Sequence, residues 1–145
     1  MSFGGAPGLS VMTERTQTPT TVSNLGVAMF TVADQDAAIA FYTEKLGFEV
    51  RADARFGEND EMRWVEVAPP GSTARLALNP PMYDKPGGGS IGVETSDVAG
   101  EHARLSAIGG VDLDEPQSAP GTPVMFMLRD PDGNTVVVVE APPAA

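Results

Sequence analysis

The chain has no cysteine, a single histidine and few basic residues. The lack of cysteine excludes disulfides, thiol catalysis and zinc sites built from thiolates. His102 is the only histidine, so any histidine-based mechanism would have to use it. Nine lysines and arginines stand against 20 aspartates and glutamates, which gives a formal net charge of −11 at pH 7. This balance argues against nucleic acid and anionic membranes as partners. It is compatible with a cationic ligand, although acidity most often serves solubility alone.

Long apolar runs are also missing. No stretch approaches the roughly 20 apolar residues that a membrane-spanning helix needs, and the N-terminus lacks the basic and apolar regions of a signal peptide. We therefore expect a cytoplasmic protein without a membrane partner. With 145 residues, 41% of them hydrophobic and 20% charged, the chain predicts one globular domain.

What is present follows a pattern that occurs twice. A turn sequence, Asp-Pro-Asp-Gly-Asn at residues 130–134, separates two strand-like runs and predicts a hairpin. Hairpin chemistry accounts for its acidic residues, so we assign no calcium site to them. Several marker residues recur 62 positions apart, namely Pro69 and Pro131, Gly71 and Gly133, and the helix-ending pairs at 46–47 and 108–109. The spacing predicts an internal duplication.

Each half is expected to contain one strand, one helix and three further strands. We predict helices over residues 34–46 and 97–108, each capped by its first aspartate. Residues 56–60 are expected to form a loop. Strands are predicted over residues 22–32, 48–54, 62–67, 73–79, 90–94, 111–113, 123–128 and 135–140. The predicted fold class is α+β, with two tandem βαβββ modules forming curved mixed sheets around a cleft and the helices outside.

The boundaries of the domain follow from composition. Residues 1–21 are rich in Gly, Pro, Ser and Thr and predict a flexible tail. Residues 22–140 are expected to form a single domain, followed by a short tail at 141–145. Within the domain, module 1 covers about 22–79, a linker rich in Pro and Gly covers 80–89, and module 2 covers about 90–140. Either Met1 or Met12 can be the natural start.

Two motifs carry a resemblance to a known superfamily. Residues 34–48, with Ala38, Phe41-Tyr42 and Leu46-Gly47-Phe48, resemble the first-module signature of the vicinal oxygen chelate superfamily. That superfamily includes glyoxalase I, bleomycin-resistance proteins and extradiol dioxygenases. The sequence at 129–134, with the following valine strand and Glu140, is similar to its C-terminal signature. The resemblance spans about residues 25–140 and implies the fold, but no single function, because the superfamily hosts several chemistries and some non-enzymes.

The resemblance also implies where a metal would be bound. Enzymes of the superfamily generally hold a divalent metal in the sheet cavity through His, Glu or Gln at set strand positions. Those positions carry Val27, Ala77, Ser90 and Val137 here. Only Ser90 has a donor atom, whereas a divalent ion needs several converging N or O donors. We therefore expect neither a metal nor another cofactor.

Other residue types suggest a binding cleft. Trp64 and Phe126 lie 62 positions apart and predict paired aromatic rings for a flat ligand, with core packing as an equally weighted alternative. Glu66, Glu94 and Glu140 lie on predicted strands and could form a carboxylate cluster, although charged strand positions more often face solvent. His102 lies in the middle of a predicted helix and is expected to point away from the cleft.

The leading hypothesis is a metal-independent small-molecule-binding protein that resembles the bleomycin-resistance members and binds without turnover. Its cleft would be lined by Met29, Trp64, Glu66, Asn79, Ser90 and Phe126. One alternative is a metal-dependent enzyme of the glyoxalase or dioxygenase type, with the three strand glutamates as atypical ligands. Another is a metal-free isomerase or lyase that uses one carboxylate as its base. Because clefts in the superfamily often form from modules of two chains, the resemblance also implies a homodimer.

Overall fold

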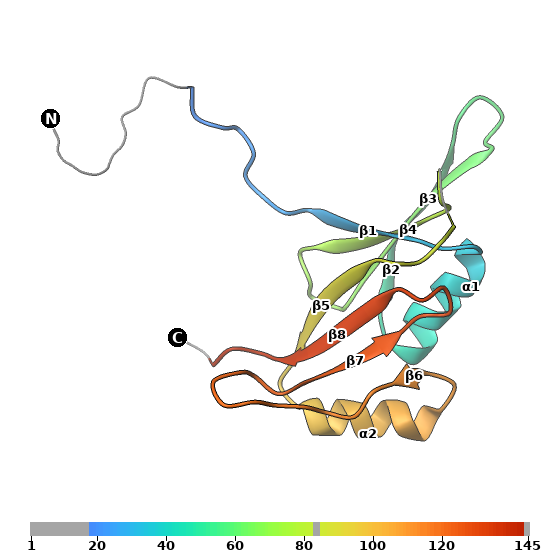
Figure 1. Ribbon diagram of the computed structural model, residues 1–145. Coiled ribbons are helices and arrows are strands. Elements are labelled where there is room, and N and C mark those ends of the chain that lie inside the picture. Colours follow the sequence, from blue (N-terminus) through green and yellow to red (C-terminus); the bar gives the residue numbers. More distant parts are fainter. Residues whose placement is uncertain (1–17, 83–84, 144–145) are drawn as a thin grey trace, which may run out of the picture.

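The structure is a computed structural model that describes residues 18–82 and 85–143. Most of the expected N-terminal tail, including Met1 and Met12, lies outside the described residues. Figure 1 shows the elements in chain order, which are β1 (Val27–Thr31), α1 (Gln35–Ala40), η2 (Phe41–Lys45), β2 (Glu49–Phe56), β3 (Met62–Ala68), β4 (Arg75–Asn79), β5 (Ser90–Thr95), α2 (Val98–Ile108), β6 (Asp112–Leu113), β7 (Met125–Arg129) and β8 (Thr135–Glu140).

The described residues form two mixed sheets with the same topology. The first sheet has the order β1-β4-β3-β2 and the second has the order β5-β8-β7-β6. In each sheet the first strand pairs in parallel with the last strand of its module, and the other neighbours are antiparallel. This repeated order confirms the predicted α+β fold of two βαβββ modules.

Both helices begin and end as their sequences predict. The Asp34 side chain accepts a hydrogen bond from the backbone N–H of Ala37, and Asp97 does the same for Gly100. The first helix continues from α1 into η2, a wider π-type turn, and ends before Gly47. Gly47 has a φ of +73°, a left-handed conformation that favours glycine.

The hairpin of β2 and β3 is longer than predicted. The ladder between these strands continues to the pairs Ala54–Trp64 and Phe56–Met62. Phe56 therefore ends β2 rather than opening a loop, because its aromatic side chain and the facing methionine suit a strand pair. The hairpin extends beyond the body of the molecule at the upper right of Figure 1.

A single hydrophobic core joins the two modules. Figure 1 shows α2 below β7 and β8, and α1 along one side of the molecule. Between the sheets and these helices lie buried side chains from both halves, including Phe30, Tyr42, Val65, Val67 and Phe126. Each fully buried aliphatic or aromatic side chain contributes roughly 1.5–3 kcal/mol. No helix in the described part of the chain is long and apolar enough to cross a membrane.

Candidate ligand-binding site

The open face of the first sheet carries four of the six predicted cleft residues. Along β3, Val65 and Val67 are fully buried against the core, so the alternating Trp64 and Glu66 lie on the opposite face. Strand pairing places Ala77 beside Glu66 and Met29 beside Ala77. Asn79 lies two residues after Ala77 and shares this face. Met29 is 62% exposed, so the face is accessible at the β1 edge.

Glu66 is fully engaged by its neighbours on this face. The indole Nε1–H of Trp64 donates to one carboxylate oxygen at 2.8 Å, and the Nε–H of Arg75 donates to the other at 2.7 Å. The Glu66 side chain is only 13% exposed. Its carboxylate therefore fixes the orientation of the indole ring and balances the charge of Arg75, and neither oxygen is left without a donor.

Phe126 does not belong to this face, and its assignment to the cleft is wrong. It is 1% exposed and packs against the His102 ring, with the two centroids 5.0 Å apart at a nearly perpendicular angle. Strand pairing shows the reason. Ala77 pairs with Glu66, and its counterpart Val137 pairs with Met127, so Phe126 corresponds to buried Val65.

The connection between helix and strand causes this shift. One residue fewer separates Gly109 from Met127 than separates Gly47 from Glu66, the counterparts in module 1. A change of one residue turns every side chain of a strand to the other face. The constant step of 62 therefore fails along β7, and Met125 takes the place that corresponds to Trp64.

His102 has the structural role that its position in the helix predicts. Its side chain is 15% exposed, and its Nε2 lies 3.0 Å from the carbonyl oxygen of Asp114. Together with the Phe126 contact, this holds α2 against the loop that follows β6. His102 does not line any of the described cavities.

The donor atoms near the superfamily's metal positions do not fit a divalent ion. Val27, Ala77 and Val137 have hydrocarbon side chains, and Ser90 lies exposed at the start of β5. Glu66 is engaged as described above. The described residues contain no group of three or more His, Cys, Asp or Glu side chains that could hold a metal.

The predicted cluster of Glu66, Glu94 and Glu140 is also not formed. Glu94 is exposed on β5 and pairs with Val139, whereas Glu140 pairs with Thr95. Because neighbouring positions of a strand face opposite sides, Glu94 and Glu140 point to different faces of the second sheet. This arrangement leaves the metal-dependent alternative without the glutamate set that it requires.

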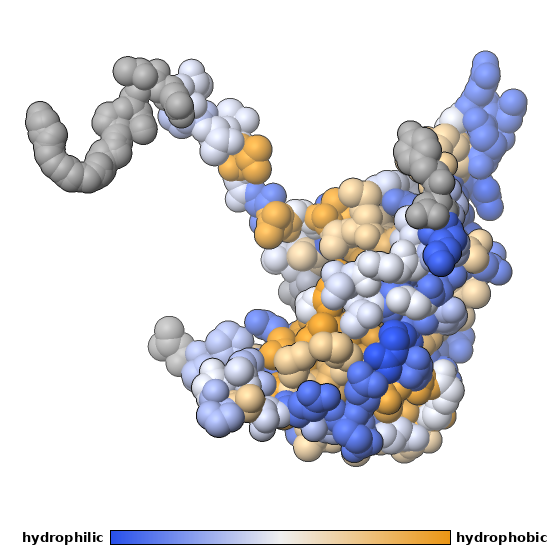
Figure 2. Space-filling model, in the orientation of Figure 1, coloured by the Kyte–Doolittle hydropathy of each residue, from blue (hydrophilic) through white to orange (hydrophobic). Residues whose placement is uncertain are grey.

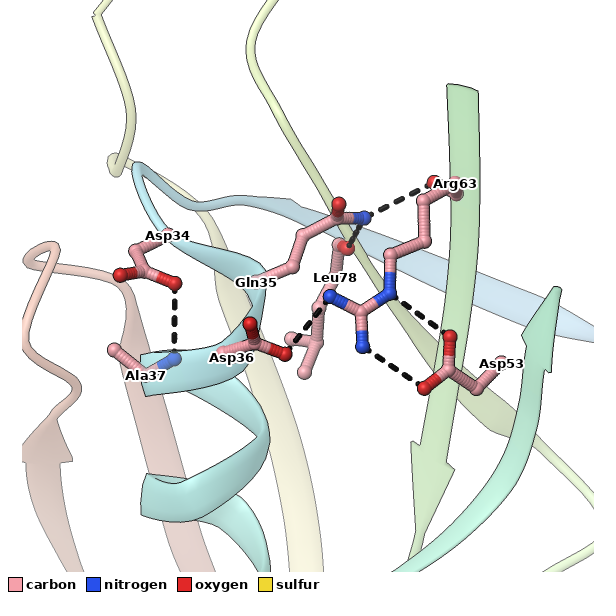
Figure 3. Close-up of polar contacts among 7 residues, drawn as sticks. All are labelled: Asp34, Gln35, Asp36, Ala37, Asp53, Arg63 and Leu78. Carbon is pink, nitrogen blue, oxygen red and sulfur yellow. Dashed lines mark hydrogen bonds and ion pairs between the residues drawn. The ribbon is translucent and has the colours of Figure 1, made fainter. Parts of the chain in front are cut away.

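A cavity of about 630 Å³ opens at the end of the first sheet. Here β3 and β4 pair only at Glu66–Ala77 and Val67–Leu76, and the ladder stops before it reaches Trp64 and Asn79. The side chain of Gln35 bridges the two backbones instead (Figure 3). Its Nε2 donates to the carbonyl oxygens of Arg63, at 3.0 Å, and Leu78, at 2.9 Å. The cavity lining includes Gln35, Phe56, Met62, Trp64, Asn79 and Pro80.

Arg63 fixes one wall of this cavity. Its guanidinium donates two hydrogen bonds to Asp53, both at 2.9 Å, and a third to Asp36 at 2.8 Å (Figure 3). These bonds raise the pKa of Arg63 above its usual value and hold the pKa of Asp53 below its usual range. The charge of Arg63 is thus shared by two carboxylates, and the start of α1 is tied to β2.

The turn at 130–134 connects the modules, a role that local turn chemistry did not predict. The backbone N–H of Ala33 donates to Asp132, and the Asn134 side chain donates to the carbonyl oxygen of Thr31. Tyr42 donates to Asp130 at 2.9 Å, and burial is the main reason why the pKa of this tyrosine is raised. These bonds hold the junction of β1 and α1, which carries Gln35 into the cavity.

The linker packs against the same turn. The backbone N–H of Gly89 donates to the Asn134 side chain at 2.9 Å. Gly87 has a φ of +95°, and a side chain there would collide with the backbone carbonyl of Asp132. The hairpin turn therefore needs both of its buried polar residues, Asp130 and Asn134, for contacts made across the molecule.

A second hollow lies between the modules. It has a volume of about 700 Å³ and lies between the β1–β4 side of module 1 and β5 of module 2, with Ala28, Leu76, Ile91 and Val139 in its lining. Figure 2 shows apolar surface on both sides of the opening between the modules. Of the predicted cleft residues, Trp64 and Asn79 line the first hollow, whereas Met29, Glu66 and Ser90 line neither.

Comparisons with known proteins agree with this architecture. The sequence profile of the Glyoxalase/Bleomycin resistance protein/Dioxygenase superfamily matches residues 24–138. The uncharacterised protein YetH of Bacillus subtilis strain 168 is 36% identical over 123 residues, which cover 82% of this chain and 99% of YetH.

Two solved structures are similar in both sequence and fold. TnmS3, an antibiotic-binding protein from Streptomyces sp. CB03234, is 31% identical, with a TM-score of 0.76 and coverage of 86% of this chain and 100% of TnmS3. A superfamily member from Sphaerobacter thermophilus DSM 20745 is 32% identical, with a TM-score of 0.75 and coverage of 84% and 100%. The chain therefore belongs to the Glyoxalase/Bleomycin resistance protein/Dioxygenase superfamily.

Proposed function

We propose that this protein binds a planar small molecule without turnover and without a metal, on the open face of its first sheet. The observation that carries the proposal is the hydrogen bonding of the Glu66 carboxylate. Both of its oxygens accept hydrogen bonds from neighbouring side chains, at 2.8 and 2.7 Å. A carboxylate held in this way positions an aromatic ring, and each of its oxygens already accepts one hydrogen bond from a fixed neighbour.

The surroundings of Trp64 suit a flat, apolar ligand. The indole orientation is set before binding, so little conformational freedom is lost when a ring lies against it. Phe56 and Met62 line the same cavity as Trp64 and are 45% and 50% exposed, and Met29, farther along the same sheet face, is 62% exposed. Methionine adapts its shape to different ligands, which suits a protein that sequesters a compound.

The similarity to TnmS3 supports binding rather than catalysis. That relative is an antibiotic-binding protein, and this chain covers all of it at 31% identity. The unsuitable donor set at Val27, Ala77, Ser90 and Val137 agrees with the same reading. An excess of acidic residues favours a cationic or neutral ligand over an anionic one.

The proposal includes a homodimer. Val22, Leu25 and Met29 are exposed by 79%, 93% and 62% along the segment that leads into β1 and along its edge. Exposed apolar side chains beside an edge strand favour coverage by a second copy. Light scattering at micromolar concentration should give about twice the monomer mass of 15.1 kDa. A mass near the monomer value would contradict the dimer without affecting the binding proposal.

Fluorescence anisotropy of proflavine, a planar cationic dye, tests the binding proposal. We expect saturable binding at 150 mM salt, with intact dye recovered and no change after chelator treatment. Covering roughly 50–80 Å² of the indole contributes about 1–2 kcal/mol, so Trp64→Ala should weaken binding roughly five- to thirtyfold.

The control for that experiment is Ile108→Ala. Ile108 is an exposed apolar residue of α2, away from the proposed face, and its replacement should leave dye affinity unchanged. Equal affinity of the wild type and Trp64→Ala, or loss of binding after chelation, would refute the proposed function.

A further inference from the structure

The gap between β3 and β4 presents a fixed hydrogen-bond acceptor. Both partners of the Gln35 amide are backbone carbonyl oxygens, so its nitrogen must be the atom that faces them. The amide orientation is therefore determined, and Oε1 points away from those two carbonyls (Figure 3). Gln35 lines the cavity, so this acceptor is positioned before any ligand arrives.

Asn79 adds a second amide to the same cavity. Its Oδ1 is buried without a hydrogen-bond partner, the only buried side-chain atom of this kind in the described part of the chain. A buried acceptor without a donor costs free energy, because it has lost its hydrogen bonds to water. The Asn79 backbone is held by the N–H of Val32 at 2.8 Å, but its side chain lies beyond the end of the ladder with β3. Asn79 lines the cavity, so this unmatched acceptor lies beside the space that a ligand donor would enter.

The rest of the lining determines what kind of donor can enter. Phe56, Met62 and Trp64 provide apolar contacts in the lining. The charged lining residues are three acidic side chains and two arginines, namely Asp34, Asp36, Glu61, Arg55 and Arg63. Arg63 is engaged by Asp36 and Asp53. The lining thus has a small negative excess, which disfavours an anionic group.

We propose that this gap recognises N–H or O–H donors on the edge of a planar aromatic ligand that is neutral or cationic. The ring lies against Trp64, and its edge donor enters between β3 and β4, where the side-chain oxygens of Asn79 and Gln35 accept from it. This inference rests on the proposed binding function and names the ligand chemistry that the same site selects.

Two acridine dyes test the recognition of edge donors. Proflavine and acridine orange share a tricyclic ring and a positive charge, but the edge amino groups of acridine orange are dimethylated and donate no hydrogen bond. The quantity to compare is the ratio of their affinities, measured by dye anisotropy at 150 mM salt. We expect Asn79→Leu to lower the ratio of proflavine affinity to acridine orange affinity about three- to tenfold, mainly because proflavine binds more weakly.

Two further variants keep the test decisive. Asn79→Ala is smaller, guards against misfolding of the leucine variant and should shift the ratio in the same direction. Gln117→Leu replaces an exposed amide of module 2 and should leave the ratio unchanged. An unchanged ratio in both Asn79 variants, with Trp64-dependent binding of both dyes intact, would overturn the donor inference alone. If the wild type bound neither dye, the proposed function would fail with it.

Discussion

Replacing Glu66 by glutamine and by alanine tests whether its carboxylate anchors the Trp64 indole or acts on the ligand directly. Glutamine keeps an acceptor for the Trp64 indole but loses the ion pair with Arg75. Alanine removes both contacts. Because the Arg75 side chain is 39% exposed, water weakens the ion pair, and we assign it at most about 0.5–1 kcal/mol. The indole hydrogen bond adds about 0.5–1.5 kcal/mol.

The two variants should therefore differ in both stability and binding. Urea denaturation should show a loss of about 0.5–1 kcal/mol for Glu66→Gln and about 1–3 kcal/mol for Glu66→Ala. Proflavine affinity should stay within about threefold in the glutamine variant, because the indole stays in place. It should fall about five- to tenfold in the alanine variant, where the ring can rotate. If glutamine weakened binding as much as alanine, the charge of Glu66 would act on the ligand directly, and the anchoring role would be wrong.

Three other predictions follow from the remaining contacts. Tyr42→Phe removes the buried bond to Asp130 and should cost about 1.5–3 kcal/mol in urea denaturation, whereas a loss below 0.5 kcal/mol would show that the turn does not hold the modules together. Phe126→Ala should cost about 3–5 kcal/mol of stability with dye affinity unchanged in the folded protein, and a selective loss of affinity would return Phe126 to the site. The pKa values of Asp53, Asp112 and Asp114 are lowered by their arginine partners, so their contribution is present above the ordinary carboxyl pKa and is lost as pH falls through the lower folded values. The melting temperature should therefore decrease as the pH falls below about 4. The decrease should be smaller in a variant in which all three aspartates are asparagine. Equal dependence of the melting temperature on pH in the two proteins would contradict this linkage.

The sequence predicted the fold because the signals that determine it are local. Asp34 and Asp97 cap helices wherever those helices pack, and the alternation along β3 separates Val65 and Val67 from Trp64 and Glu66 without knowledge of the partner strands. The repeated order of elements then restricts the topology. Both modules could be placed on this basis, including the open face that carries Met29, Trp64, Glu66 and Asn79.

Predictions from the sequence were wrong or incomplete where a one-residue difference in length or a contact with a distant segment determines the position of a side chain. Module 2 has one residue fewer between its helix and β7 than module 1 has before β3, which turns Phe126 from the predicted cleft into the core. A constant repeat step conceals such a change. The bridge that Gln35 makes between β3 and β4 depends on strands about 28 and 43 residues away. Likewise, Asp130 and Asn134 explain a hairpin turn completely, so nothing local indicates their contacts with module 1.

The most direct test of the account follows the single indole N–H of the protein by two-dimensional NMR during titration with proflavine. Trp64 is the only tryptophan, so one cross-peak reports on the proposed site. We predict a saturable shift of this peak with one transition, together with shifts of the Met29 and Met62 methyl groups, while the His102 ring signals stay in place. Saturable dye binding that leaves the Trp64 peak unmoved would contradict the assignment of the ligand to this face.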